Sequence, residues 1–85
     1  MFTQVIHAVR VSIDPDSPVA PYRQVAAILR ERVEAGQITA RLPSIADLVG
    51  EFGIARTTAS KALHVLVEEG IAEVSPGMGH YVKRD

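Results

Sequence analysis

The side chains best suited to binding chemistry lie within residues 52–70, where short polar and cationic groups recur at helical spacing. These groups are Arg56, Thr57, Thr58, Ser60, Lys61 and His64. An arginine guanidinium can donate two hydrogen bonds to O6 and N7 of guanine, and a threonine can contact a phosphate or a thymine methyl group. The first acid on this face is Glu68. The pattern favours a DNA-binding surface; the alternative is a solvated helix face on which Thr57 or Thr58 only caps the helix.

A second candidate element is the glycine-rich sequence Gly77-Met78-Gly79-His80 near the C-terminus. Glycine adopts positive φ and permits close backbone approach, so such a loop can lie against a phosphate or enter a minor groove. His80 would add a hydrogen-bond donor. An ordinary hairpin turn also favours glycine, and the sequence lacks the Gly-Lys-Ser/Thr of a nucleotide-binding loop.

Catalytic and metal-binding chemistry find little support. The three histidines, His7, His64 and His80, form no His-Glu-x-x-His motif, and the chain has no cysteine. A metal site is therefore not expected. No histidine is placed by sequence to activate a serine, and a chain of 85 residues has little room for an enclosed pocket. We expect no enzyme activity, no catalytic residue and no cofactor.

The elements that position these residues follow from hydrophobic spacing. A helix over about residues 55–69 is predicted, ending near Gly70, because apolar residues recur at i, i+3, i+4, i+7 and i+8. They are Ala59, Ala62, Leu63, Leu66 and Val67. Just upstream, Ser44 followed by Asp47 is a capping-box candidate for a short helix over residues 44–51. Two helices joined by a tight turn are typical of a helix-turn-helix.

The rest of the chain completes a winged helix-turn-helix. A first helix is predicted over about residues 22–35, ending at Gly36, and a connector over residues 37–43 that turns Ile38 and Leu42 inward. Its core stripe comprises Val25, Ile28, Leu29 and Val33. Strand, glycine-rich turn and strand over residues 71–83 predict a β-hairpin wing. The expected fold class is α+β, mainly α, with three helices, a two- to three-stranded wing and an N-terminal strand.

The N-terminal strand is predicted over residues 3–14, where apolar and polar residues alternate. A proline-rich linker follows, so residues 1–20 form strand and linker while residues 21–85 form the winged helix, a single domain overall. An alternating strand can pair edge to edge with its own copy. We therefore expect this segment to supply a homodimer contact.

Four segments in register resemble the winged-helix DNA-binding domain of the GntR family of bacterial transcription regulators. Within residues 21–82 they read PYRQVAAILRERVEAG, RLPSIADLVGEFGIARTTASKAL, LVEEGIAEV and PGMGHYV. The resemblance implies a sequence-specific regulator of double-stranded DNA, by family tendency a repressor. It places the helix over about residues 55–69 in the major groove of a palindromic operator and the wing, residues 75–83, on the adjacent backbone or minor groove.

The resemblance assigns contacting roles residue by residue. Those it covers are Ser44, Arg56, Thr57, Thr58, Gly77 and Gly79; Lys61, His64 and His80 are added from their position on the helix and wing. Family members usually carry basic residues where this chain has Ala46, Ser60 and Met78, and a helix-capping serine where it has Ala55. We expect these changes to weaken phosphate contacts and to make binding depend on dimerisation or a partner.

Composition limits the class of protein. Of 85 residues, 47% are hydrophobic and 22% charged, with a net charge of −1, which predicts a folded domain with weak non-specific DNA binding. Acids gather away from Arg56, Lys61, His80, Lys83 and Arg84, so one cationic face and an acidic back are expected. Without cysteine, leader peptide or membrane-length apolar run, the expected location is the cytoplasm, on the nucleoid. Family members usually add an effector domain; none is expected here, and no small-molecule effector site.

Two alternatives remain open. The acidic sequence pI of about 6.3 and the missing arginines also suit a winged helix that binds protein. A DNA-bending accessory factor of a mobile element is the other. Salt separates the first from a DNA binder, because phosphate contacts weaken steeply between about 50 and 200 mM salt.

Overall fold

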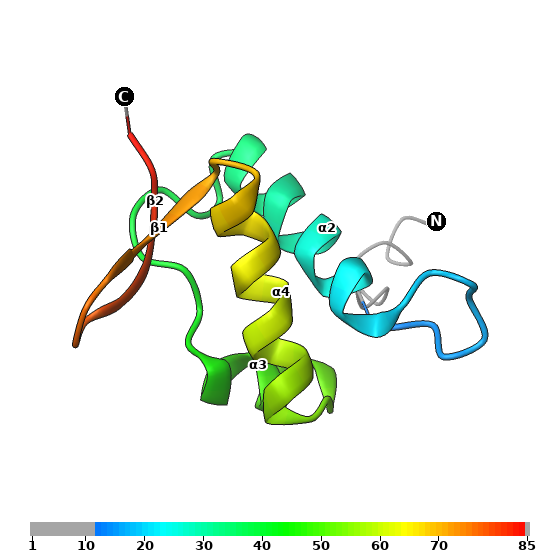
Figure 1. Ribbon diagram of the computed structural model, residues 1–85. Coiled ribbons are helices and arrows are strands. Elements are labelled where there is room, and N and C mark those ends of the chain that lie inside the picture. The colour runs from blue at the N-terminus through cyan, green and yellow to red at the C-terminus, as the bar shows by residue number, and fades with distance from the viewer. Residues whose placement is uncertain (1–11, 85) are drawn as a thin grey trace, which may run out of the picture.

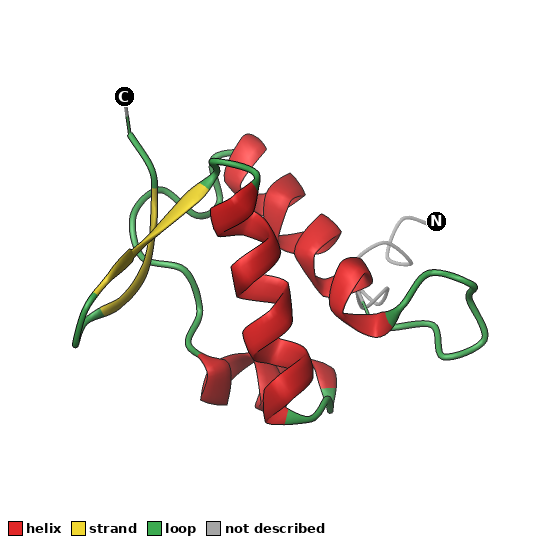
Figure 2. Cartoon of the chain, viewed as in Figure 1, coloured by secondary structure: helices red, strands yellow, loops and turns green. Residues whose placement is uncertain are grey.

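The computed structural model describes residues 12–84. Helices α2 (Pro21–Glu34), α3 (Ile45–Phe52) and α4 (Arg56–Glu68) precede a hairpin of strands β1 (Ala72–Ser75) and β2 (Gly79–Val82). Figure 1 shows α4 between α2 on one side and the hairpin on the other, with α3 crossing near its N-terminal end. In Figure 2 the hairpin projects from the helical body as a wing. The structure confirms the predicted winged helix-turn-helix.

Helix α2 carries the first layer of the core. It begins with a proline in its first turn, where the missing N–H costs nothing. Val25, Ala26 and Leu29 are fully buried, and α2 packs mainly against α4. The predicted stripe is confirmed at Val25 and Leu29, whereas Ile28 and Val33 are only half-buried.

The core is small and is drawn from every helix and the connector. Its largest fully buried side chains are Val25, Leu29, Leu42, Leu48, Leu63 and Leu66. Each stabilises the fold by about 1.5–3 kcal/mol relative to an exposed position. Because α4 contributes more buried residues than any other element, its outer face has a fixed orientation relative to α2 and α3.

Helix α3 has the capping box expected from its sequence. The Asp47 N–H donates to Ser44 Oγ at 3.0 Å, and the Ser44 N–H donates to Asp47 Oδ2 at 3.1 Å. At the other end Gly53 takes the left-handed conformation, with φ of 66°, and its N–H donates to the Val49 carbonyl. That left-handed residue starts the turn that leads from α3 into α4.

The connector joins the wing to the helices. The Leu42 N–H donates to the His80 carbonyl at 2.9 Å, and the Val82 N–H donates to the Ala40 carbonyl at 2.7 Å. Arg41 and Tyr81 form a bridge between these bonds. The connector therefore adds a short third strand segment beside β2, and Leu42 enters the core as predicted.

The described part of the N-terminal region is a turn-rich linker held by Gln24. Its side chain accepts a hydrogen bond from the Asp14 N–H at 2.8 Å and donates to the Val19 carbonyl at 2.8 Å. Residues 12–14, the end of the predicted strand, carry no strand. The rest of that strand, with its expected dimer contact, lies outside the described residues. Within residues 12–84 the helices are too short or too polar to cross a membrane.

Candidate nucleic-acid interface

Helix α4 separates a buried face from a polar one. Ala59, Ala62, Leu63 and Leu66 are fully buried. The exposed set is Arg56, Thr57, Ser60, Lys61 and His64, and Thr58 is half-buried at its edge. The exposed residues recur at i, i+1, i+4, i+5 and i+8, which places them on one face. The structure thus brings the predicted recognition residues of α4 together in solvent.

The N-terminus of α4 has no side-chain cap. Ala55 occupies the N-cap position, and no side-chain hydrogen bond is made there. This argues against Thr57 or Thr58 serving only as caps. The first N–H groups of a helix point outward and carry a partial positive charge that favours an anion. Arg56 is the first residue of α4, so its guanidinium and these N–H groups belong to the same end of the helix.

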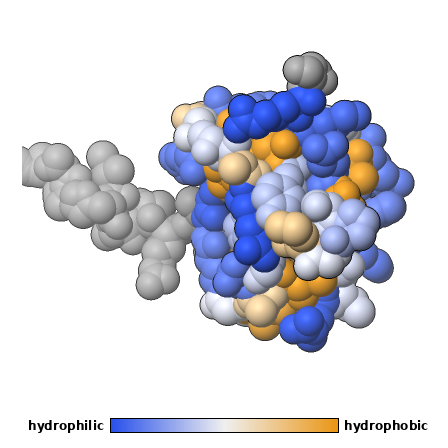
Figure 3. All heavy atoms as spheres, turned by 90° about the vertical axis from the view of Figure 1, so that its left-hand side faces the viewer, coloured by the Kyte–Doolittle hydropathy of each residue, from blue (hydrophilic) through white to orange (hydrophobic). Residues whose placement is uncertain are grey.

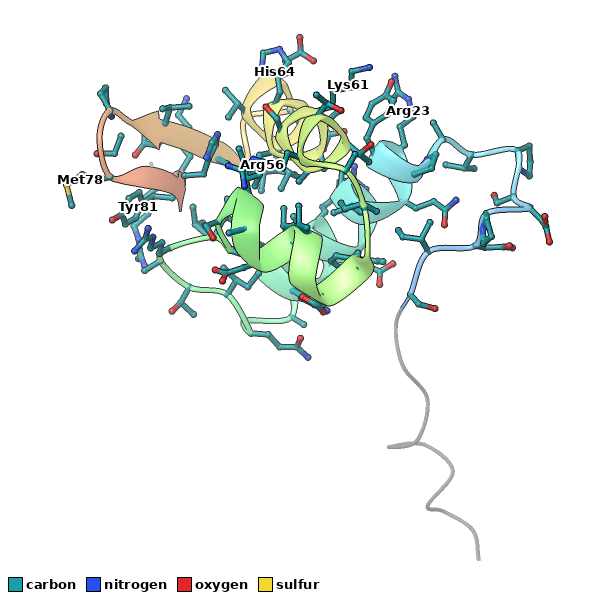
Figure 4. All side chains as sticks on the ribbon, turned by 90° about the horizontal axis from the view of Figure 1, so that it is seen from below. Arg23, Arg56, Lys61, His64, Met78 and Tyr81 are labelled. Carbon is teal, nitrogen blue, oxygen red and sulfur yellow. The ribbon has the colours of Figure 1, made fainter. Side chains whose placement is uncertain are left out.

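A hollow between α3, α4 and the wing collects several of the predicted residues. It is lined by Arg41, Leu42, Ser44, Ile45, Ala46, Arg56, Gly79 and His80. Figure 4 shows Arg56 in the space between the hairpin and the helices. Ser44, Arg56, Gly79 and His80 were predicted from sequence, and they now share one surface. Three of the side chains that line this hollow, Arg41, Arg56 and His80, are basic.

Arg41 is the residue that sequence reasoning missed. A Cβ added at Gly79 would lie 3.5 Å from Nε and from Nη2 of Arg41, so the guanidinium covers the glycine. Ala46, the position at which the family resemblance implies a basic side chain, lines the same hollow without a charge. Arg41 supplies a guanidinium there instead. Its position directly before Leu42-Pro43 is the available signal, but the sequence pattern of the connector predicts only packing.

A second cationic cluster lies beside the middle of α4. The Lys61 ammonium lies 5.7 Å from the centre of the Tyr22 ring, and the Arg23 guanidinium lies 5.2 Å from it. An aromatic ring attracts a cation that lies over its face, so the Tyr22 ring holds both Arg23 and Lys61 near it. The sequence pattern at Tyr22 and Arg23 predicts only the start of a helix. They extend the exposed face of α4 toward the N-terminus of α2 (Figure 4).

The far end of the α4 face carries an acid. His64 Nε2 lies 3.3 Å from Glu68 Oε2, and both side chains are about two-thirds exposed, at 69% and 66%. His64 therefore extends the exposed face as predicted, but with a carboxylate beside it. The cationic character of the face is strongest at its N-terminal half.

Other acids are paired away from this face. Arg32 donates through both terminal nitrogens to the Glu51 carboxylate, one bond being 3.2 Å long, and Arg30 donates to Glu69 twice at 3.0 Å. The hydrogen bond from Arg32 lowers the pKa of Glu51 below its ordinary value. The pKa of Asp47 is lowered by hydrogen bonds within its capping box with Ser44. The hydrogen bonds to Glu51 and Asp47 favour the ionised form of these two carboxylates.

The wing presents its glycines at the tip. Gly77 and Gly79 have φ of 78° and 119°, the region that side chains rarely adopt. Met78 between them is 58% exposed. Arg84, expected to add charge to the wing, donates from Nη2 to the Thr39 carbonyl and so fixes the end of the chain to the connector. Among the described residues no cluster of histidine, cysteine and acids could hold a metal ion.

Comparison with known proteins decides the family. Residues 21–82 match the model of the bacterial regulatory proteins, gntR family. The chain belongs to the gntR family. The mannosyl-D-glycerate transport/metabolism system repressor MngR of Escherichia coli is 41% identical over 66 residues, which are 75% of this chain and 28% of that protein. The histidine utilization repressor of Klebsiella aerogenes is 37% identical over 71 residues, 80% of this chain and 30% of the repressor.

Solved structures of the gntR family share the fold. YtrA from Sulfolobus acidocaldarius, a GntR-family transcription factor, superposes with a TM-score of 0.79 at 31% identity, covering 88% of this chain and 81% of YtrA. The DNA-binding domain of AraR in complex with operator ORE1 gives a TM-score of 0.74 at 25% identity, covering 88% of this chain and 94% of the AraR chain. The chain spans less than a third of the length of the two repressors named above.

Proposed function

We propose that this gntR-family domain binds a specific operator in double-stranded DNA and acts as a transcriptional repressor. The observation that carries the proposal is the position of Arg56. It stands at the uncapped N-terminus of α4 and in the hollow beside the wing. The first turn of a recognition helix lies against the base edges in the major groove, so an arginine there can read a base.

The exposed face of α4 supplies the remaining contacts. Thr57 and Ser60 offer short hydroxyls next to Arg56, and Lys61 lies one turn further along. Short side chains let the helix approach the base edges closely, while longer cations reach the phosphates. His64 ends the row, and Thr58 lies at its edge.

The flanking groups bind the DNA backbone on both sides. Arg41 and His80 beside the wing contact phosphates next to the α4 N-terminus, with Ser44 and the backbone of Gly79 lining the same hollow. At the opposite end, Lys61 and Arg23 around Tyr22 contact a second backbone segment. Such contacts fix the orientation of the domain on the duplex without reading sequence.

The net charge of −1 limits non-specific affinity. Few phosphates are neutralised by one domain, and each one adds to both affinity and salt dependence. The domain therefore acts as a homodimer on a palindromic operator, in which two half-sites double the number of contacts. The role is regulatory rather than catalytic, and it places the protein on the nucleoid in the cytoplasm.

The test is selection of bound duplexes from a random DNA pool at about 50 and about 200 mM salt, the range over which phosphate contacts weaken. Wild type, Arg56→Ala and Arg30→Ala are run in parallel. Arg30 pairs with Glu69 away from the α4 face and serves as the matched control. We expect a palindromic consensus from wild type and Arg30→Ala that Arg56→Ala fails to enrich. Absence of any consensus from wild type at both salts contradicts the proposal and favours a protein partner.

A further inference from the structure

Met78 is an apolar side chain held in solvent at the tip of the wing. Among the described residues the large hydrophobic side chains that are exposed are Val19, Val74 and Met78, and Met78 at 58% is the most exposed of them. Figure 3, which faces the hairpin, shows hydrophobic surface there among hydrophilic neighbours. Figure 4 shows Met78 projecting from the tip away from the helices.

The backbone of the tip forms a tight turn. The Met78 N–H donates to the Ser75 carbonyl at 2.9 Å and closes the turn. Pro76 and Gly77 occupy its two central positions, and Gly77 has a positive φ of 78°, the pattern of a type II turn. Because Gly77 and Gly79 have no side chains, Met78 is flanked by bare backbone. Met78 is therefore the apolar side chain at the end of the hairpin, and below it Val74, Tyr81 and Val82 line a groove of the wing together with Met78.

Cations surround the base of this tip. The Arg41 guanidinium covers Gly79, and Arg56 and His80 line the same hollow. A DNA minor groove is about 6 Å wide and carries negative potential, so it admits one narrow tip with cations beside it. A protein-binding hot spot is instead a broad apolar patch surrounded by further packed contacts. Met78 stands at the end of a narrow hairpin with the Arg41 guanidinium beside the next residue, and this shape and charge favour DNA.

We propose that Met78 inserts into the minor groove as a wedge between two base pairs and bends the operator. The inference rests on the proposed function, because it needs α4 in the adjacent major groove. Methionine and proline are among the side chains that unstack a base step in this way, and such wedges kink DNA by about 20–90°. Pyrimidine–purine steps unstack most easily. The wing thereby favours operators with a flexible base step at this position, although no hydrogen bond contacts the bases of that step.

The experiment uses the full chain and the duplex chosen by selection, labelled with a donor and an acceptor dye at its two ends. Energy transfer reports bending, and 2-aminopurine placed at successive steps reports unstacking. We expect wild type to raise energy transfer and to brighten 2-aminopurine at one step. Met78→Ala is expected to bind about tenfold more weakly, from the lost apolar contact, with no bend and no brightening.

Three further variants sharpen the test. Met78→Leu keeps an apolar wedge and is expected to keep the bend. Met78→Lys is expected to retain affinity through a phosphate contact while losing the bend. Val19→Ala removes an exposed apolar side chain on the linker, remote from the wing, and is expected to behave as wild type.

The outcomes separate the wedge from the proposed function. Equal bending by wild type and Met78→Ala overturns the wedge and leaves operator binding intact. Straight DNA in the wild-type complex does the same. If wild type selects no duplex, the proposed function itself fails and the wedge fails with it. If Met78→Ala only abolishes self-association in sedimentation, with DNA bending unchanged, Met78 belongs to a protein interface and the inference is wrong.

Discussion

The guanidinium of Arg41 covers Gly79, with Nε and Nη2 each 3.5 Å from the place a Cβ would occupy. This contact joins the connector before α3 to the strand that leaves the wing tip. Two hydrogen bonds join the same segments, from the Leu42 N–H to the His80 carbonyl and from the Val82 N–H to the Ala40 carbonyl. Together these contacts fix the wing relative to the helix-turn-helix. A wing held in this way keeps His80 and the tip in a fixed position beside the N-terminal end of α4.

The first prediction concerns glycines. Gly79→Ala is expected to destabilise the fold by about 1–3 kcal/mol, because alanine is strained at the positive φ of 119° that Gly79 adopts. Gly50→Ala is the matched control. Gly50 lies inside α3, without positive φ and with nothing within 4 Å of an added Cβ. That change is expected to stabilise by up to about 1 kcal/mol. Urea unfolding monitored by circular dichroism measures both.

The second prediction concerns the two helix caps. Ser44→Ala removes the capping box of α3 and is expected to cost about 1 kcal/mol of unfolding free energy. Ala55→Ser supplies the cap that α4 lacks and is expected to add about as much. Thermal melts of the two variants should move in opposite directions from wild type. A shift in the same direction for both contradicts the assigned caps.

The third prediction is a pH dependence from the Arg32–Glu51 pair. The pKa of Glu51 is lowered from its ordinary value of 4.5, chiefly by the Arg32 hydrogen bond. The pair therefore stabilises the fold above about pH 4.5, and its contribution is lost as the pH falls through the lowered pKa. Glu51→Gln is expected to remove this part of the dependence, at a cost below about 1 kcal/mol at pH 7 because both groups are partly exposed.

A double-mutant cycle with Arg32→Gln isolates that contribution. The two single variants and the double variant are unfolded in urea at pH 7 and at pH 3. We expect a coupling energy at pH 7 that is smaller at pH 3, because part of the Glu51 population is then protonated. Additive effects at pH 7 show that the pair does not contribute to stability.

Helix positions and local caps could be predicted from sequence because their causes are local. Ser44 and Asp47 signal the cap of α3 within one turn, and the apolar spacing from Ala59 onward predicts the buried face of α4. Arg41 could not be placed, because its role depends on pairing with Tyr81, far along the chain. The cluster of Lys61 with Tyr22 has the same origin. It exists only because the core packs α2 against α4.

The fourth prediction distinguishes backbone contacts from base reading. Arg23→Ala and Lys61→Ala are each expected to weaken binding to all duplexes alike and to lower the slope of log affinity against log salt by about 1. Fluorescence anisotropy at several salt concentrations, with Arg30→Ala as control, measures the slopes. Unchanged slopes in both variants place the Tyr22 cluster away from the DNA.

The central claim, that Arg56 on α4 reads operator sequence, is tested most directly by a competition titration. Wild type, Arg56→Ala and Arg30→Ala bind the selected duplex against a shuffled duplex of the same composition. We predict that wild type and Arg30→Ala prefer the selected duplex and that Arg56→Ala loses about 1–3 kcal/mol of that preference. An undiminished preference in Arg56→Ala, or none in wild type, contradicts the account.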